Sequence, residues 1–378
     1  VFERLYIMRK KVVFLIPNLA HGGAEKVLVN LVNNIDKSKF DVTLQTLFDV
    51  GVNKKYLHDD VKYVAGCKVL VKGYTHLLKL FSPEKLYKHY VKGDYDIVVS
   101  YLEGPAARIV SGCTNPNTKT VSWIHIEQNT KAAIQTGFRD YEEAVKLYQN
   151  YDRFVCVSNT VRESVKSVIG LRCPIDVLYN TNESDKIISK SNETIADLTF
   201  DKDVYNLVSV AKIVLSKGYD RLMKIHKKLL DDGIKNHVYI LGIGEEQEKY
   251  EKYLKDNHLE DTFTFLGFRD NPYKYVKNAD LYVCSSRREG FSTAVTEALI
   301  VGTPVVSTNC SGAYELLGDN NEYGIVTENN EDALYEGIKK ILTEENLLKH
   351  YKEQAKVRGQ RFSTEKTVKA VEDMLNNL

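Results

Sequence analysis

The chain has 378 residues, of which 43% are hydrophobic and 27% charged, and its formal net charge is +1. This composition excludes a disordered chain, and the length exceeds what one ordinary core needs, so we expect two domains. No run of about 18 uncharged apolar residues occurs, so no membrane-spanning helix is predicted. Residues 1–180 carry 25 Lys and Arg against 18 Asp and Glu, whereas the remainder carries 27 against 33. The basic first half is expected to meet something anionic.

Neither the start of the chain nor its cysteines predict a secreted protein. Met8 is followed by three basic residues, as at a natural start, so residues 1–7 are interpreted as an upstream extension without function, and no signal peptide is recognised. The six cysteines show no C-x-x-C pair and no zinc-ligand spacing, which favours reduced thiols in the cytosol.

Alternating strands and helices are predicted along the first half. The apolar run at residues 11–16 predicts a buried strand, followed by a helix with Val27, Leu28, Leu31, Val32 and Ile35 on one face. Further strands are predicted at residues 41–47, 95–101, 119–124, 153–157 and 174–178.

A second series of the same kind fills the rest of the chain. Its strands are predicted at residues 205–211, 237–242, 262–266, 280–285, 304–307 and 323–326, with a helix over residues 219–232. The polar stretch 181–200 separates the two series. Two βα series in succession predict an α/β protein with two doubly wound parallel sheets. A last helix starts near Ser363 or Thr364, with Val368, Val371, Leu375 and Leu378 on one face.

Gly22 and Gly23 lie between the first strand and its helix. Without Cβ atoms they would let a ligand approach the backbone at a helix N-terminus, which favours an anion. The Lys-Ser/Thr ending of a P-loop is absent, and an ordinary tight turn is the alternative.

A basic segment covers residues 68–92, where six lysines face one acid, Glu84. Ser82 and Pro83 predict a helix start, and leucines and tyrosines are interleaved with the lysines. Such a helix could lie on anionic lipid, and an ordinary helix with a solvated face is the alternative. No RNA-binding motif accompanies the segment, so nucleic acid is not an expected partner.

Several polar residues follow predicted strands of the first half. His125 lies at the carboxyl end of a strand, where ligands bind in open α/β sheets, and a structural role is its alternative. Glu103 ends the preceding strand and could orient an acceptor, as could Glu127, although both could be ordinary loop acids. The D-x-D of residues 94–96 stands at the start of a strand, the wrong end for a ligand, and is interpreted as polar strand entry.

Lys212 and Lys217 follow the first strand of the second series. Two cations there could neutralise a diphosphate as a sugar leaves it, and solvated surface lysines are the alternative. Gly242-x-Gly244 lacks the third glycine of a dinucleotide fingerprint, and its loop is expected to line a base pocket with Gly267, Phe268 and Arg269.

Glu289 and Glu297 form the most informative pair. Glu289 hangs at a strand end and Glu297 lies within the next helix. The helix start between them offers backbone N–H groups that can seat phosphate, and carboxylates can bind vicinal hydroxyls. This combination predicts a sugar-nucleotide site, whereas a surface acid beside a helix acid is the alternative. The N–H groups belong to Gly290, Phe291, Ser292 and Thr293.

Three motifs together resemble one enzyme family. The pattern E-G-F-(x5)-E-A-L-(x2)-G-x-P-V-V over residues 289–306 resembles glycosyltransferase family 4, retaining enzymes of the GT-B fold that include bacterial surface-polysaccharide glycosyltransferases. The segment with Ser311, Gly312 and Glu315 is similar to the family's G-G-x-x-E, and the segment 211–218 to its G-R-(x4)-K-G. Ala211 and Lys212 replace the usual Gly-Arg, so a bidentate contact at position 212 is lost.

This resemblance implies two doubly wound domains that face each other across a cleft. Residues 1–180 would form the acceptor-binding domain, with a C-terminal helix over 363–378 packing back on it, and residues 181–362 the nucleotide-sugar-binding domain. Glu297 would bind the ribose hydroxyls, Lys212 and Lys217 the diphosphate, and Glu289 with the 290–293 amides the sugar. The resemblance further implies that His125 contacts the sugar, Gly22 and Gly23 the donor phosphates, and Gly267 and Phe268 the base.

The expected activity is retaining transfer of a sugar from a nucleotide sugar, with UDP as the carrier and without a metal or other cofactor. The expected acceptor is a hydroxyl of a polyprenyl-diphosphate-linked saccharide in capsule or other surface polysaccharide synthesis. The expected location is the cytoplasm, at the inner face of the membrane. Two alternatives stay open: a GT-B sugar-nucleotide epimerase, and a non-catalytic sugar-nucleotide-binding scaffold subunit.

Overall fold

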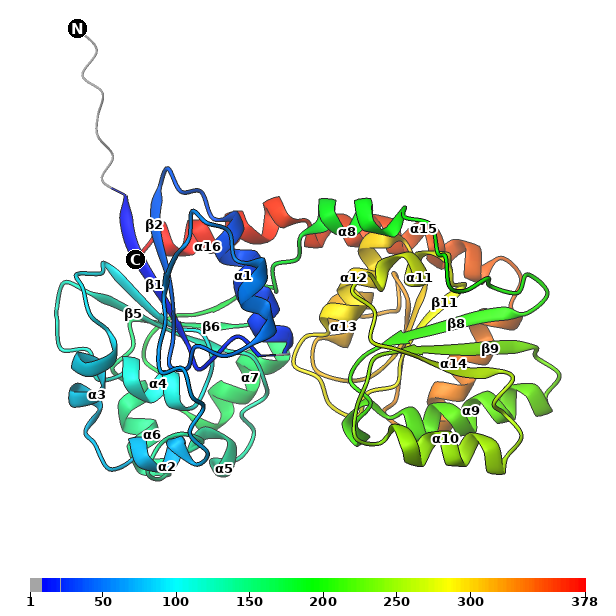
Figure 1. Cartoon of the computed structure of the whole chain (residues 1–378), viewed down its shortest axis with the longest axis horizontal. Helices are drawn as coiled ribbons and strands as arrows, with labels where there is room; N and C mark the ends of the chain where they lie inside the picture. Colours follow the sequence, from blue (N-terminus) through cyan, green and yellow to red (C-terminus); the bar gives the residue numbers. More distant parts are fainter. Residues whose placement is uncertain (1–8, 21) are drawn as a thin grey trace, which may run out of the picture. The chain divides into compact units, whose positions relative to one another are not determined.

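The computed structural model describes residues 9–20 and 22–378, so the segment 1–7 interpreted as an extension lies outside the described residues. The chain forms two compact units (Figure 1). Unit 1 comprises the residues up to 182 together with 364–378, and unit 2 comprises residues 183–363.

Unit 1 is built on a seven-stranded sheet with the order β3-β2-β1-β4-β5-β6-β7, and each pair of neighbours is parallel. Its strands are β1 (Lys10–Ile16), β2 (Phe40–Thr46), β3 (Lys62–Val64), β4 (Ile97–Ser100), β5 (Lys119–Ile124), β6 (Arg153–Cys156) and β7 (Ile175–Val177). Its helices are α1 (Gly23–Asn34), η1 (Val52–Tyr56), α2 (Tyr74–Leu78), α3 (Pro83–Tyr90), α4 (Pro105–Val110), α5 (Lys131–Ile134), α6 (Tyr141–Tyr148), α7 (Asn159–Val168) and α16 (Thr364–Asn376).

Unit 2 repeats this architecture with six parallel strands in the order β10-β9-β8-β11-β12-β13. Its strands are β8 (Tyr205–Val210), β9 (Asn236–Leu241), β10 (Phe263–Gly267), β11 (Leu281–Cys284), β12 (Val305–Thr308) and β13 (Ile325–Thr327). Its helices are α8 (Ser184–Ser191), η2 (Leu215–Lys217), α9 (Tyr219–Asp231), α10 (Gln247–Asp256), α11 (Tyr273–Asn278), α12 (Thr293–Val301), α13 (Ala313–Leu317), α14 (Glu331–Thr343), α15 (Leu347–Gly359) and η3 (Gln360–Phe362).

Burial explains why the central strands are apolar without alternation. All residues from Val12 to Ile16 of β1 are fully buried, because helices cover both faces of a parallel sheet. In unit 2, α9, α10 and α14 gather on one face of the sheet and α8, α11, α12 and α15 on the other (Figure 1). The core of unit 2 lies between β8, β9, β11 and the helices α9 and α14.

The C-terminal helix α16, red in Figure 1, packs beside α1 in unit 1. Lys10 Nζ donates to the carbonyl oxygens of Leu375 and Asn376 at 3.0 and 2.9 Å, and Glu372 accepts from the Asp36 backbone N–H at 2.8 Å. Val368, Val371 and Leu375 are buried as expected, whereas Leu378 lies beyond the end of the helix and Met374 is buried in addition.

Candidate active site at the carboxyl edge of the second sheet

The sheet of unit 2 changes direction between β8 and β11. From β8 the chain proceeds to β9 and β10 on one side, and from β11 to β12 and β13 on the other. Ligands of open α/β sheets bind at such a switch point, beyond the carboxyl ends of the strands. Lys212 and Lys217 follow β8 and Glu289 follows β11, so three of the predicted residues lie on the two loops of this switch point.

Lys217 and Glu289 contact each other directly. Lys217 Nζ donates to Glu289 Oε1 at 2.6 Å, and Ser286 Oγ donates to the same oxygen at 2.6 Å. The side chains of Lys217 and Glu289 are 24% and 15% exposed, so both can be reached from solvent. Because both donors bind Oε1, the other carboxylate oxygen can accept from a ligand hydroxyl.

Backbone contacts lock the two loops together. Gly218 has φ +70°, and a Cβ atom there would lie 2.1 Å from the carbonyl oxygen of Ser285. The buried guanidinium of Arg221 donates to the carbonyl oxygens of Ser285 at 2.8 Å and Ser286 at 2.7 Å. Ser285 Oγ in turn donates to Lys217 O at 2.8 Å. The ammonium and the carboxylate are therefore held in place before a ligand arrives.

The N-terminus of α12 supplies backbone donors next to Glu289 in the chain. Ser292 caps the helix by accepting from the Val295 N–H at 3.3 Å, and Gly290, Phe291 and Thr293 surround this cap. A helix N-terminus carries unpaired N–H groups and a partial positive charge, which together favour phosphate.

Phe291 joins this helix start to the segment that contains Ser311 and Glu315. A Cβ atom on Gly312 would lie 2.7 Å from Cδ2 of Phe291, so the two motifs of the family resemblance are packed against each other. Position 312 therefore requires glycine for two reasons. A Cβ atom would collide with Phe291, and the φ of +77° is a backbone conformation that other residues rarely adopt.

Glu297 lies farther along α12 and has a different neighbour. It is buried, and Tyr273 Oη of α11 donates to its Oε1 at 3.3 Å.

The remaining predicted donor-binding residues lie on the loops after β8, β9 and β10. Lys212 is exposed after β8. The Gly242 N–H donates to Gly267 O at 2.9 Å, which brings together the loops after β9 and β10, and Phe268 is exposed beside them. Gly242 has φ +151°, and its Cβ atom would lie 1.9 Å from Ala211 O.

The candidates of the first half lie along the carboxyl edge of the unit 1 sheet. Gly22 and Gly23 follow β1, Glu103 follows β4 and His125 follows β5, and β1 and β4 form the switch point of this sheet. Glu103 Oε2 accepts from the His125 backbone N–H at 3.0 Å, so these two residues meet through the backbone of His125. Glu127 Oε2 accepts from Asn129 Nδ2 at 2.7 Å.

The imidazole of His125 is buried against Tyr101, with ring centroids 4.8 Å apart. Burial lowers the pKa of His125 to about 3, although a hydrogen bond to the Tyr101 backbone acts in the opposite direction. The imidazole is therefore neutral at physiological pH. Its Nε2 atom is buried and has no hydrogen-bond partner among the described residues.

Asp96 of the D-x-D motif connects the starts of β4 and β1. Asp96 Oδ2 accepts from the Lys11 N–H at 2.7 Å, and the Asp96 N–H donates to Lys11 O at 2.9 Å. Both contacts lie at the amino end of β4, where the motif was interpreted as polar strand entry. Asp96 therefore helps to align β4 with β1.

Two residues of the unit 2 site, Ser286 and Arg221, were not predicted. Ser286 lies two residues after the end of β11, and this place at a strand end would have identified it. Arg221 left no signal, because a buried arginine that binds carbonyl groups leaves no pattern in the sequence.

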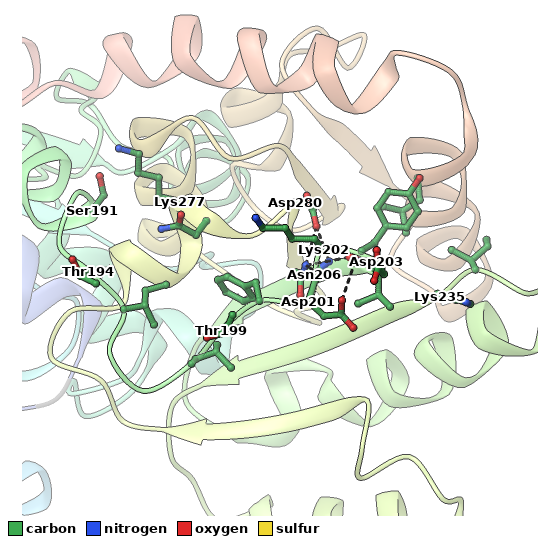
Figure 2. A pocket seen from close by; sticks show the side chains of 18 of the residues that line it. Ser191, Thr194, Thr199, Asp201, Lys202, Asp203, Asn206, Lys235, Lys277 and Asp280 are labelled. Atoms are coloured by element: carbon green, nitrogen blue, oxygen red, sulfur yellow. Dashed lines mark hydrogen bonds between the residues drawn. The ribbon is translucent and has the colours of Figure 1, made fainter.

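A hollow lies at the other edge of the unit 2 sheet, away from the candidate site (Figure 2). It has a volume of about 1400 Å³ and is lined by polar and apolar residues around the amino end of β8, and its charged residues include Asp201, Lys235 and Asp280. Asp280 Oδ2 accepts from the Asn206 backbone N–H at 2.8 Å, so this acid already aligns β8 with β11. The amino edge is the wrong edge for a ligand of a parallel sheet, so the carboxyl edge is the candidate active site.

Two family descriptions match successive parts of the chain. "Glycosyltransferase Family 4" matches residues 21–184, and "Glycosyl transferases group 1" matches residues 190–358. Among the described residues, no helix is long and apolar enough to cross a bilayer.

One relative and two solved structures resemble the chain over 97% to 98% of its length. One is the N-acetylgalactosamine-N,N'-diacetylbacillosaminyl-diphospho-undecaprenol 4-alpha-N-acetylgalactosaminyltransferase of Campylobacter jejuni, which is 26% identical and aligns over 98% of this chain and all of that protein. Anabaena HepE in complex with UDP has a TM-score of 0.77 at 18% identity, with 97% of this chain and 100% of that chain covered. Sucrose-phosphate synthase from Thermosynechococcus elongatus has a TM-score of 0.78 at 15% identity, with 98% and 99% covered. The chain belongs to glycosyltransferase family 4 and is a glycosyltransferase with the GT-B fold.

Proposed function

We propose that this glycosyltransferase moves a sugar from a nucleotide sugar to a saccharide hydroxyl, with its donor site at the carboxyl edge of the unit 2 sheet. The observation that carries the proposal is the contact of Lys217 and Ser286 with Glu289 at the switch point between β8 and β11. A cation, a carboxylate and a helix N-terminus are the groups that a sugar diphosphate requires.

Each group has an assigned part in donor binding. The ammonium groups of Lys212 and Lys217 bind the diphosphate, together with the amides of residues 290–293. Glu289 accepts from hydroxyls of the sugar, and Glu297 accepts from the ribose hydroxyls. Gly267 and Phe268 line the base pocket. We propose UDP as the carrier, which is supported by the UDP complex of the structural neighbour from Anabaena.

The proposed reaction retains the anomeric configuration. The bond from the anomeric carbon to the diphosphate oxygen breaks, and the acceptor oxygen forms its new bond on the same face of the sugar. The departing phosphate oxygen takes the proton of the acceptor hydroxyl, so no separate base is needed. Positive charge from Lys217 and the start of α12 stabilises the leaving diphosphate, which is the part that a metal ion would otherwise play.

Unit 1 is assigned to the acceptor, with Glu103 and Glu127 as candidate acceptor-binding residues and His125 as a neutral hydrogen-bonding group toward the transferred sugar. Gly22 and Gly23 are assigned to the donor phosphates. The acceptor that we propose is a saccharide on a polyprenyl diphosphate, used in capsule or another surface polysaccharide. Support comes from the undecaprenyl-diphosphate named for the Campylobacter relative and from the basic residues of the first half. Such an acceptor would hold the enzyme at the inner face of the cell membrane.

A ligand panel followed by product analysis tests this function. Thermal stability is measured with UDP, GDP, ADP and TDP and then with UDP-sugars, because a ligand at a hundredfold excess over its Kd stabilises by roughly 2.7 kcal/mol. We expect UDP to stabilise most, and we expect UDP release from a UDP-sugar to require an acceptor saccharide. Release of UDP without any acceptor would favour the epimerase, and binding without turnover the non-catalytic subunit.

A further inference from the structure

An exposed apolar segment in unit 1 lies outside the proposed chemistry. Large apolar side chains that are 42% to 74% exposed are concentrated in residues 69–81, within the short helix α2 and on either side of it. Single exposed apolar residues are normal on a protein surface, but a cluster marks an interaction site. The cluster, named here the apolar tip, consists of Val69, Leu70, Val71, Leu77, Leu80 and Phe81.

Exposed lysines flank the apolar tip along the chain. Lys68 and Lys72 flank its first part, and Lys85 and Lys88 lie on α3 just after its second part, all of them exposed. Protein–protein interfaces are depleted in lysine, whereas anionic lipid attracts it. The mixture of exposed apolar residues and lysines therefore fits the surface of an anionic bilayer better than a protein partner or a second copy of this chain.

The fold holds the second part of the tip in one conformation. The side chain of Arg108 is buried, and its guanidinium donates to the carbonyl oxygens of Leu78 and Phe81, each at 2.9 Å. Arg139 Nε donates to the carbonyl oxygen of Lys79 at 2.7 Å. Three carbonyl groups of the turn are thus satisfied, two by the buried Arg108 and one by Arg139 at the surface, while Leu80 and Phe81 stay exposed.

A carboxylate completes this support. Glu143 accepts from Arg108 Nε at 3.0 Å and from Arg108 Nη2 at 2.9 Å. A buried arginine is costly unless it is paired and hydrogen-bonded, and here it is both. Since these three backbone carbonyls already have partners, they would not be left unsatisfied if the turn entered a less polar medium.

We infer that the apolar tip inserts into the headgroup region of a bilayer that contains anionic lipid, with the neighbouring lysines at the lipid phosphates. The sequence predicted that the helix starting at Ser82 and Pro83 would itself lie on the lipid, whereas here the turn before that helix makes the apolar contact. Helix α3 exposes lysines but buries Leu86 against the unit, so the apolar contribution comes from the turn before it. This inference concerns a partner of unit 1 and does not rest on the nucleotide-sugar chemistry.

Vesicle binding by the full chain tests the inference. Co-sedimentation is measured with phosphatidylcholine vesicles that contain or lack phosphatidylglycerol. We expect binding only with phosphatidylglycerol and a loss of about tenfold or more in affinity for Leu80→Asp and Phe81→Asp. The matched control is Val357→Asp, which changes an apolar residue of similar exposure in unit 2 and should bind as the wild type does. The double variant Lys85→Glu, Lys88→Glu should also weaken binding, although it leaves all residues of the apolar tip unchanged.

A fluorescence probe gives a second readout at the same position. The chain has one Trp, Trp123, which is buried, so Phe81→Trp adds an exposed indole over a constant background. We expect its emission to shift to the blue on adding phosphatidylglycerol vesicles and that of Val357→Trp to stay unchanged. Equal loss of binding in the tip and control variants, or no binding to anionic vesicles, would overturn the inference. A blue shift that grows with protein concentration without vesicles would show a second copy instead. UDP binding in solution should be the same for Leu80→Asp and the wild type, which separates failure here from failure of the proposed function.

Discussion

Glu289 is the residue on which the proposed chemistry depends most. It receives two hydrogen bonds on one oxygen, one of them from a cation, and both donors come from loops that Arg221 and Gly218 hold together. A carboxylate fixed in this way can distinguish a correctly placed sugar hydroxyl from a misplaced one, because it cannot follow the ligand.

Replacement of Glu289 by glutamine should reduce turnover far more than binding. The amide keeps the size of the side chain but loses the charge that pairs with Lys217, so we expect kcat to fall by about 100-fold, while the Kd for UDP changes by less than about tenfold. Steady-state kinetics and calorimetric UDP titration measure the two quantities. The matched control is Glu336→Gln on the exposed surface of α14, and equal activity of Glu289→Gln and Glu336→Gln would contradict the assignment.

Because the imidazole of His125 is buried, we expect the free energy of unfolding of unit 1 to depend on pH. Its folded pKa, about 3, lies below the ordinary value of 6.5 because the ring is buried. Between these values the unfolded chain binds the proton more readily than the folded one, so stability falls as the pH is lowered from 6.5. The contribution is at most about 1.4 kcal/mol per pH unit.

Denaturant unfolding of the wild type and of His125→Gln between pH 7 and pH 4 measures this dependence. All other titrating groups are shared, so the difference between the two curves isolates the histidine. We expect the wild type to lose stability faster than the variant as the pH falls, and parallel curves would show that burial of the imidazole has no such effect.

At the scale of elements, the glycines of the loops show how the site is assembled. Gly218 and Gly233 both belong to unit 2 and have φ of +70° and +77°, but only Gly218 has a backbone atom in the way of a Cβ, whereas nothing lies within 4 Å at Gly233. The pair therefore separates backbone strain from steric conflict.

Gly233→Ala should cost about 1 kcal/mol of unfolding free energy, the strain of a left-handed alanine. Gly218→Ala carries the same strain and in addition forces the loops after β8 and β11 apart, so we expect a cost of about 3 kcal/mol and a large loss of transferase activity. Chemical denaturation and an activity assay on both variants test this. Equal costs and equal activities would mean that the close approach of Gly218 to Ser285 does not hold the site.

The elements were predictable where burial leaves a pattern. Strands β1 and β11 appear as continuous apolar runs because helices cover them on both faces. Strand β3 was missed, because its three residues begin with the exposed Lys62 and form no apolar run. In the basic segment the sequence predicted a helix but not which side packs inward, so the exposure of Leu80 and Phe81 emerged only from the structure.

For the whole molecule, the order of the strands is what the sequence could not supply. Lys217 and Glu289 were each recognised from a place after a strand, but they are 72 positions apart. Their contact depends on β8 lying next to β11, which is a property of the sheet and not of either motif. Ser286 and Arg221 support that contact, and of these two Arg221 is identified only by the assembled sheet.

Activity of the whole enzyme should resist chelation. Lys217 and the N-terminus of α12 are assigned the positive charge that stabilises the leaving diphosphate, so turnover in millimolar EDTA should equal turnover without it. The assay follows UDP release with a UDP-sugar and acceptor. Loss of activity in EDTA with recovery on adding magnesium would show that the lysine is not sufficient.

The central claim is that the donor binds at the carboxyl edge of the second sheet and not in the hollow at its amino edge (Figure 2). Calorimetric titration of UDP into Lys217→Met and Lys235→Met tests it most directly, because each substitution removes one cation from one of the two places. We predict that Lys217→Met weakens UDP binding by about tenfold or more and that Lys235→Met binds as the wild type does. Unchanged binding to Lys217→Met, with weakened binding to Lys235→Met, would contradict the account.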